Sequence, residues 1–300
     1  MVIKKISGKG GNMQKISADV LEKMMKSNLS SKEVDFILYV AQYQNNYGVA
    51  SGIYYKDVCE ALDLSYQGFY NCRAALEEKG IIRSEKKSYY DCDITILNNE
   101  FDPEHYDRGY VNIHVPMIQD PRFRELKAGA KLMGLWLMRE WLIYKSKTKQ
   151  SGYQILKVNF MAKFREMLGL TNRVIRSYLG ALEPFLSVYL EAGKKYFITF
   201  REEYVRAGNR MSDSENGVLR SHLVRVACRR NRVASDPEKE REIIDILSIH
   251  DKDIRKLRSF PLSGIIADTL AFLNQNVRSK YKWKRYLNPS LIHKEVMAYI

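Results

Sequence analysis

The chain has 300 residues, enough for two or three domains of ordinary size, and its formal net charge is +14. Its four cysteines lie far apart and form no C-x-x-C pair, which argues against a disulfide framework and against a zinc site. No apolar run approaches the roughly 20 residues that cross a bilayer, and no signal-peptide pattern opens the sequence, so we expect a cytoplasmic protein without membrane contact.

The positive charge is unevenly distributed along the chain. Residues 1–100 contain 13 Lys and Arg against 13 Asp and Glu, whereas residues 121–180 contain 13 against 3. A dense positive field on one segment favours a polyanionic partner.

Residues 1–29 are expected to form an N-terminal arm followed by a short helix from Ser17 to Met25. The first domain, residues 30–100, opens on the capping box formed by Ser30 and Glu33, and apolar residues then recur at helical spacing. A short strand at Ile53–Tyr55 and a helix at Lys56–Leu62 are predicted to follow.

Ser65 is then predicted to cap a further helix that ends before Gly80. The sequence IIRSEKKSYYDCDITIL that follows has the pattern of two strands joined by a charged tip. Helix, strand, helix, turn, helix and hairpin, in that order, is the plan of a winged helix-turn-helix domain.

A polar linker at residues 101–110 separates this domain from a second one at residues 111–205, which repeats the plan. Its predicted elements are a helix at Arg124–Tyr144, a strand at Tyr153–Val158, a helix at Phe160–Leu168, a helix capped by Thr171 and cut short by Pro184, and a hairpin that turns at Ala192 and Gly193.

The two domains also align without a gap at an offset of 106 residues. Leu62 then matches Leu168, Ser65 matches Thr171 and Leu76 matches Leu182. The shared positions are the apolar and capping ones, which indicates a duplicated fold with divergent surfaces.

We therefore predict a mainly α protein with small β wings, of the α+β class. It would contain two winged helix-turn-helix domains, a linker at residues 206–217 and a helical C-terminal domain at residues 218–300, which carries an apolar stripe at residues 265–273.

In a helix-turn-helix, the exposed residues in the first turns of the second helix meet base edges in the major groove. The candidates in the second copy are Asn172, Arg173, Arg176 and Ser177, and those in the first copy are Tyr66, Gln67, Tyr70 and Asn71. Arginine can grip guanine and asparagine can grip adenine bidentately, so the second copy is better equipped to read DNA.

Other basic residues are candidates for contacts to the phosphate backbone, which set register and salt dependence without specifying sequence. Around the second copy they are Lys127, Lys131, Lys145, Lys147, Lys149, Lys157, Lys163, Arg165, Lys194 and Lys195. On the wing of the first copy they are Arg83, Lys86 and Lys87.

The C-terminal segment adds two basic clusters. One contains Arg220, Arg225, Arg229, Arg230 and Arg232, and the other is RSKYKWKR at residues 278–285. Their pattern is compatible both with phosphate contact and base stacking and with a solvated helix face.

No spacing of nucleophile, base or metal ligands indicates an enzyme, and no cofactor is expected. His222-x-x-Arg225 has the form of a recombinase motif, but no tyrosine follows at the distance that chemistry needs. The acidic run at residues 102–107 is explained by a charged linker more simply than by a metal site.

The stretch Tyr110–Phe200, with VNIHVP, DPRFRELKAGAKLMGLWLMRE and GKKYFITF, resembles the N-terminal winged helix of plasmid RepA-type replication initiators from Gram-positive bacteria. That family usually carries one such domain at the front, so the extra copy departs from its pattern. Tandem winged helices also occur in iteron-binding initiators, in which the first tends to dimerise and the second to grip DNA.

The resemblance implies a sequence-specific binder of double-stranded DNA that acts as the replication initiator of a plasmid or mobile element. A transcriptional regulator on the same scaffold is the alternative, and a protein-interaction scaffold is the third reading. Besides DNA, the candidate partners are a second copy bound through the first winged helix and a replication protein bound to the C-terminal domain.

Overall fold

A computed structural model describes residues 15–45, 47–89, 91–101, 109–112, 115–149, 151–204, 213–231, 236–250 and 289–299. The chain is a mixed α and β protein in which helices predominate and the strands form three small sheets, in agreement with the predicted α+β class. The described residues fall into two compact units. One takes residues 15–85 and 93–204, and the other takes residues 86–92 and 213–299.

The larger unit begins with a strand that the sequence analysis did not predict. This strand, β1 (Lys15–Ser17), pairs antiparallel with β5 (Tyr110–Asn112). Ser17 then caps α1 (Ala18–Lys26) by accepting a hydrogen bond from the Val20 amide, which confirms the predicted short helix. A three-residue strand carries too little alternation to be recognised in a sequence.

The next elements correspond to the first predicted domain. They are α2 (Ser31–Ala41), β2 (Val49–Tyr54), α3 (Tyr55–Leu62), α4 (Tyr66–Glu78), β3 (Ile82–Lys86) and β4 (Asp91–Ile96). The capping box at Ser30 is formed in both directions, and the Ser65 side chain caps α4 as predicted.

Two short helices, α5 (Val115–Gln119) and α6 (Pro121–Glu125), precede the second set of elements. That set is α7 (Ala128–Thr148), β6 (Tyr153–Leu156), α8 (Lys157–Leu168), α9 (Asn172–Ala181), β7 (Leu186–Glu191) and β8 (Lys195–Phe200), and the short 3-10 helix η1 (Glu202–Tyr204) follows.

Two boundaries in this region differ from the prediction. The helix expected from Arg124 begins at Ala128, because Leu126 and Lys127 have extended backbones that separate α6 from α7. The strand expected to reach Val158 ends at Leu156, and α8 takes over at Lys157.

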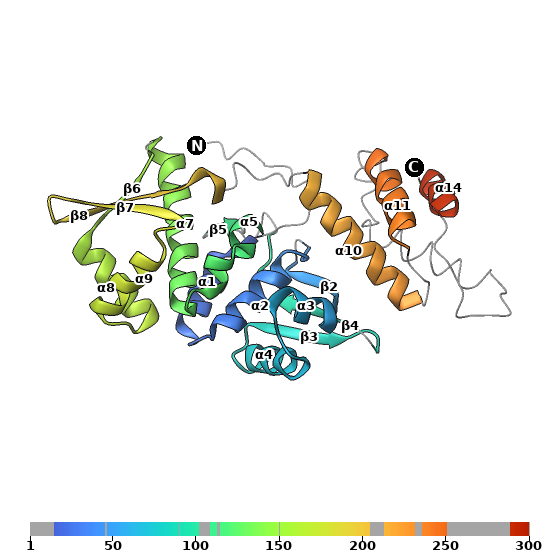
Figure 1. The fold of residues 1–300 in the computed structure, drawn as a ribbon, viewed down its shortest axis with the longest axis horizontal. Helices are drawn as coiled ribbons and strands as arrows, with labels where there is room; N and C mark the ends of the chain where they lie inside the picture. The colour runs from blue at the N-terminus through green and yellow to red at the C-terminus, as the bar shows by residue number, and fades with distance from the viewer. Residues whose placement is uncertain are drawn as a thin grey trace. The chain divides into compact units, whose positions relative to one another are not determined.

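The two sets share one arrangement, which we call the first repeat (α2 to β4) and the second repeat (α7 to β8). Their sheets have the orders β2-β4-β3 and β6-β8-β7, so the last strand is central in both. Asp63 and Gly169 join the paired helices, lie 106 residues apart and both adopt left-handed backbone angles, with φ of 51° and 64°. The predicted duplication is therefore present in the order of elements and in sheet topology. Figure 1 shows α8 and α9 on one side of the β6-β8-β7 sheet.

The smaller unit contains α10 (Asp213–Asn231), α11 (Pro237–Ile249) and α14 (Pro289–Tyr299). Because α10 begins at Asp213, it takes in residues 213–217 of the segment predicted as a linker at residues 206–217. The predicted apolar stripe at residues 265–273 lies outside the described residues. Among the described helices, none combines the length and apolar character needed to cross a bilayer.

Candidate nucleic-acid interface

Helix α9 is held to the second repeat by one apolar face. Ile175 and Leu182 are fully buried, Leu179 is nearly so, and α9 packs against α7 and α8. Thr171 caps the helix by accepting a hydrogen bond from the Val174 amide. These contacts fix the rotation of α9 about its axis and so determine which side chains face solvent.

Two glycines in α7 allow α9 to approach closely. A Cβ atom on Gly129 would lie 2.6 Å from Cε2 of Tyr178, and one on Gly134 would lie 2.9 Å from Cδ2 of Leu182. Both distances are shorter than carbon atoms tolerate, so a side chain at either place would force the Tyr178 or Leu182 side chain to shift.

The outward face of α9 carries the four predicted base-reading residues. Asn172, Arg173, Arg176 and Ser177 are all exposed. Arg176 donates from Nε to the Asn172 carbonyl oxygen at 3.2 Å, across one helical turn. Helices α8 and α9 together hold five Lys and Arg and a single acid, Glu166, so this face presents donors in a positive field.

Three lysines meet where the tip of the β7–β8 hairpin contacts the start of α8: Lys194 and Lys195 on the hairpin and Lys157 on the helix. The Lys157 amide donates to the Lys194 carbonyl oxygen at 2.8 Å, and Leu156 pairs with Lys195 across the sheet. Lys194 and Lys195 are exposed and Lys157 is half-buried. Burial raises the pKa of the Tyr196 phenol, and the positive charge of the Arg176 guanidinium opposes that shift.

Two further predicted phosphate contacts are sterically available. Arg165 is exposed in the last turn of α8, the turn that leads through Gly169 to α9. Lys127 is exposed at the start of α7, two residues from the glycine that contacts Tyr178.

The prediction for Lys131 is wrong, because its side chain is completely buried. Its Nζ donates to both carboxylate oxygens of Asp35 at 2.7 and 2.8 Å, to the Ser31 hydroxyl at 2.7 Å and to the Arg124 carbonyl at 2.9 Å. Burial raises the pKa of the Asp35 carboxyl and lowers the pKa of the Lys131 ammonium, and the hydrogen bonds between them oppose both shifts. Lys131 therefore holds α7 against α2 and cannot reach a phosphate.

Lys145, Lys147 and Lys149 are exposed but lie at the far end of α7 from the contacts with α9. The rise of an α-helix puts Lys147 about 20 Å along the axis from Gly134. The Lys145 ammonium also sits 4.8 Å from the centre of the Trp141 ring. The three lysines form a separate positive end of α7.

Lys163 is half-buried, and its ammonium lies 4.1 Å from the centre of the Trp136 ring. A cation–π interaction with the indole ring stabilises the ammonium in this position. The ammonium therefore rests against the Trp136 ring, and its contact with phosphate stays a prediction.

The equivalent helix in the first repeat carries different chemistry. Tyr66, Gln67 and Asn71 are exposed and Tyr70 is half-buried. Gln67 donates to the side-chain oxygen of Asn71 at 2.8 Å, and the Tyr66 ring packs at a tilt of 59° against the Tyr70 ring, with ring centres 4.7 Å apart. Arg83, Lys86 and Lys87 on the hairpin between β3 and β4 are exposed, and their contact with phosphate stays a prediction.

The arginines of α10 are largely engaged inside the smaller unit. Arg220 donates to Ser248 at 2.7 Å, Arg225 donates to Glu240 at 3.2 Å, and Arg230 donates to Asp91 at 3.1 Å. These contacts favour the interpretation of this cluster as a structural helix face. Arg232 and residues 278–285 lie outside the described residues.

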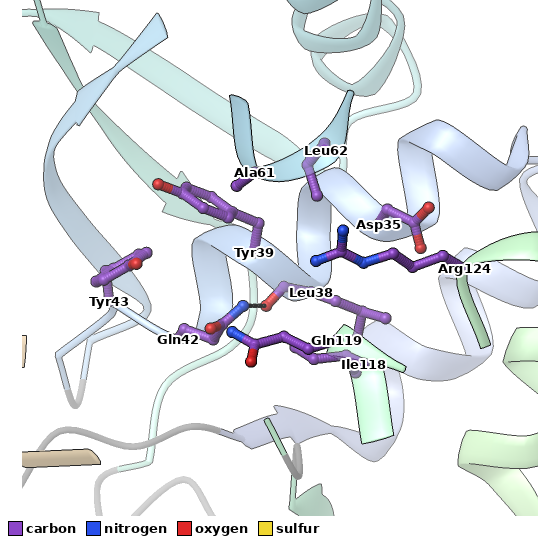
Figure 2. Close-up of a pocket in the computed structure, with 10 residues that line it drawn as sticks. All are labelled: Asp35, Leu38, Tyr39, Gln42, Tyr43, Ala61, Leu62, Ile118, Gln119 and Arg124. Carbon is purple, nitrogen blue, oxygen red and sulfur yellow. Dashed lines mark hydrogen bonds between the residues drawn. The ribbon is translucent and has the colours of Figure 1, made fainter. Parts of the chain in front are cut away.

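A small pocket of about 100 Å³ lies among α2, the end of α3 and the segment from α5 to α6 (Figure 2). Tyr39, Tyr43, Gln42 and Arg124 line it, and Gln42 is bonded to the Leu38 carbonyl. Pockets for small-molecule ligands are several times larger. No group of three potential metal ligands occurs within the described ranges, and the acidic run at residues 102–107 is outside them.

Comparison with known proteins gives no match to a protein-family model, to a curated protein or to a solved structure.

Proposed function

We propose that the chain binds double-stranded DNA with sequence specificity, and that its two repeats are winged helix-turn-helix modules. Helix α9 would enter the major groove with its first turns, while the β7–β8 hairpin would serve as the wing. The observation that carries this proposal is the outward face of α9, on which Asn172, Arg173, Arg176 and Ser177 are exposed on a helix fixed by close packing.

The charge around α9 supports the same reading. In the same repeat Arg165, Lys194 and Lys195 are exposed and Lys157 is half-buried, and phosphate contacts from such residues would orient the module on the duplex. An account in which the repeats have no nucleic-acid role leaves this local excess of cations unexplained.

We further propose origin binding as the biological role, which rests on the resemblance of Tyr110–Phe200 to plasmid initiators. A transcriptional regulator is the second candidate, because the same α9 face would serve at a promoter. We also propose a homodimer through the first repeat and a replication protein bound to the C-terminal domain.

The test is selection of bound fragments from a pool of random duplexes by the purified chain, followed by sequencing. A recurrent motif is expected, and its place in the genome of origin distinguishes repeats at a replication origin from a single promoter site. No affinity for any duplex at low salt would refute the proposal and leave the scaffold reading.

A further inference from the structure

The solvent face of the first repeat is built around a tyrosine cluster, formed by Tyr55 of α3 and by Tyr66 and Tyr70 of α4. The ring centres of Tyr55 and Tyr66 are 5.1 Å apart with the rings nearly perpendicular, and those of Tyr66 and Tyr70 are 4.7 Å apart. Tyr66 keeps 58% of its surface exposed. A large ring left open to water beside others is typical of a contact surface.

The cluster occupies the positions that carry the arginine face in the second repeat. At the offset of 106, Tyr66 corresponds to Asn172 and Tyr70 corresponds to Arg176. The two repeats therefore present different chemistry from the same place in the same arrangement.

The sign of the charge is reversed as well. Residues 55–78 contain two Lys and Arg against five Asp and Glu, whereas residues 157–181 contain five against one. Glu60 and Asp63 are exposed where α3 leads into α4. Lys32 reaches this end of α3, where its ammonium donates to the Leu62 and Asp63 carbonyls, and the face stays net negative. Such a surface repels phosphate, and it would repel the same face of a second copy, so the proposed homodimer would have to form through another part of the first repeat.

Aromatic rings and carboxylates both attract cationic side chains. The cluster already holds one, since the Arg73 guanidinium lies 5.0 Å from the centre of the Tyr70 ring. Tyrosine and arginine are also the residues enriched at protein interfaces.

We propose that the α3–α4 face of the first repeat docks a Lys- and Arg-rich segment of a partner protein. Tyr66, the exposed ring of the cluster, supplies a face for a cation, and Glu60 and Asp63 supply counter-charges. This inference goes beyond DNA binding and does not depend on it.

The test uses the full chain and a fluorescent peptide of alternating arginine and glycine, with a peptide of the same length in which citrulline replaces arginine. Anisotropy at low salt should show saturable binding of the arginine peptide and much weaker binding of the citrulline peptide. Saturable binding is informative because the chain as a whole carries a net charge of +14 and repels a cation. Absence of binding, or equal binding of both peptides, would overturn the proposal.

Variants locate the site. Tyr66→Ala should weaken peptide binding about two- to fivefold, the range that one exposed cation–π contact supplies. Glu60→Gln combined with Asp63→Asn should weaken it by a similar factor and flatten its salt dependence, while Tyr66→Phe, which keeps the ring, should bind nearly as well as wild type. The matched control is Tyr189→Ala, which removes a tyrosine of similar exposure from the second repeat. Equal loss in the control would refute the assignment to α3–α4.

The same variants are then titrated with duplex DNA. Unchanged duplex affinity in Tyr66→Ala, together with weaker peptide binding, is the expected pattern. A loss of duplex affinity without loss of peptide binding would make α4 a second DNA-reading helix and would reject the peptide site. Failure of all duplex binding in the wild-type chain would refute the DNA proposal and leave the peptide result standing.

Discussion

Lys131 and Asp35 form a buried ion pair between the two repeats, with the ammonium 2.7 and 2.8 Å from the two carboxylate oxygens. Lys131 belongs to the first helix of the second repeat, and Asp35 belongs to the first helix of the first repeat. The pair also draws in the Ser31 hydroxyl and the Arg124 carbonyl, so the ammonium has four oxygen partners and no contact with water.

We expect Lys131→Met to destabilise the chain by about 3–5 kcal/mol, because it leaves the Asp35 carboxylate buried without its partner. Adding Asp35→Leu should recover most of this loss, since an apolar pair of similar volume often replaces a buried ion pair at little cost. Urea unfolding followed by tryptophan fluorescence measures both. Duplex affinity of the folded Lys131→Met variant should equal that of wild type, and a reduced salt slope would mean that Lys131 contacts DNA after all.

Arg173→Ala should weaken binding to the selected duplex by about 1–3 kcal/mol and relax specificity at one position. Lys194→Ala should weaken all duplexes about equally and lower the salt slope by about one unit. Titrations against matched and scrambled duplexes at several salt concentrations separate the two effects. Tyr70→Ala serves as the comparison in the first repeat, and a loss equal to that of Arg173→Ala would contradict the ranking of the two helices.

Gly134→Ala should destabilise the second repeat by about 1–3 kcal/mol, because its Cβ would press on the buried Leu182 side chain. Gly180→Ala is the matched control, since nothing lies within 4 Å of a Cβ there and the helix should gain about 0.5–1 kcal/mol. Thermal unfolding of the two variants should move in opposite directions. A neutral Gly134→Ala would show that α7 and α9 are packed less closely than described.

Stability should fall as the pH is lowered from about 4 to about 2, partly because of Asp120. Hydrogen bonds from Arg122 are the main cause that lowers the pKa of this carboxyl from 3.8 to about 2. Between these values the unfolded chain binds more protons than the folded one, so the contribution is present above pH 4 and is lost on acidification.

The variant Asp120→Asn removes the titrating group and should show a shallower fall in unfolding free energy over the same range, as measured by urea titrations at several pH values. Asp19→Asn, at a site in α1, is the control. If the unfolding free energies of wild type and Asp120→Asn fall equally between about pH 4 and about pH 2, the fall would be due to other carboxyls.

The repeat arrangement was predictable because its signals are local. Ser30 and Ser65 cap helices by chemistry that needs only the next three residues, and Thr171 repeats that signal at the same offset. The left-handed turn at Gly169 and the hairpin turn at Gly193 are likewise set by residue type.

The role of Lys131 could not be predicted, because its partner Asp35 lies 96 residues away and no local pattern connects them. One signal in the sequence could have revealed this role. Lys131 stands directly before the apolar run Leu132–Leu137, where a lysine exposed to solvent is not expected. The strand β1 could not be predicted for the same reason, since it pairs with the distant strand β5 and has no turn beside it.

The ion pair between the repeats has no mirror image. At the offset of 106, the counterpart of Asp35 is Trp141 and the counterpart of Lys131 is Met25, so each repeat supplies only one of the two charges. Two copies of one half would bring together two charges of the same sign, so neither half could pair its charge by self-association. In an isolated half, that charge would lie on a surface that is buried in the full chain. We therefore expect the two repeats to unfold as one cooperative unit, and expression of either half alone should yield an insoluble or unfolded product.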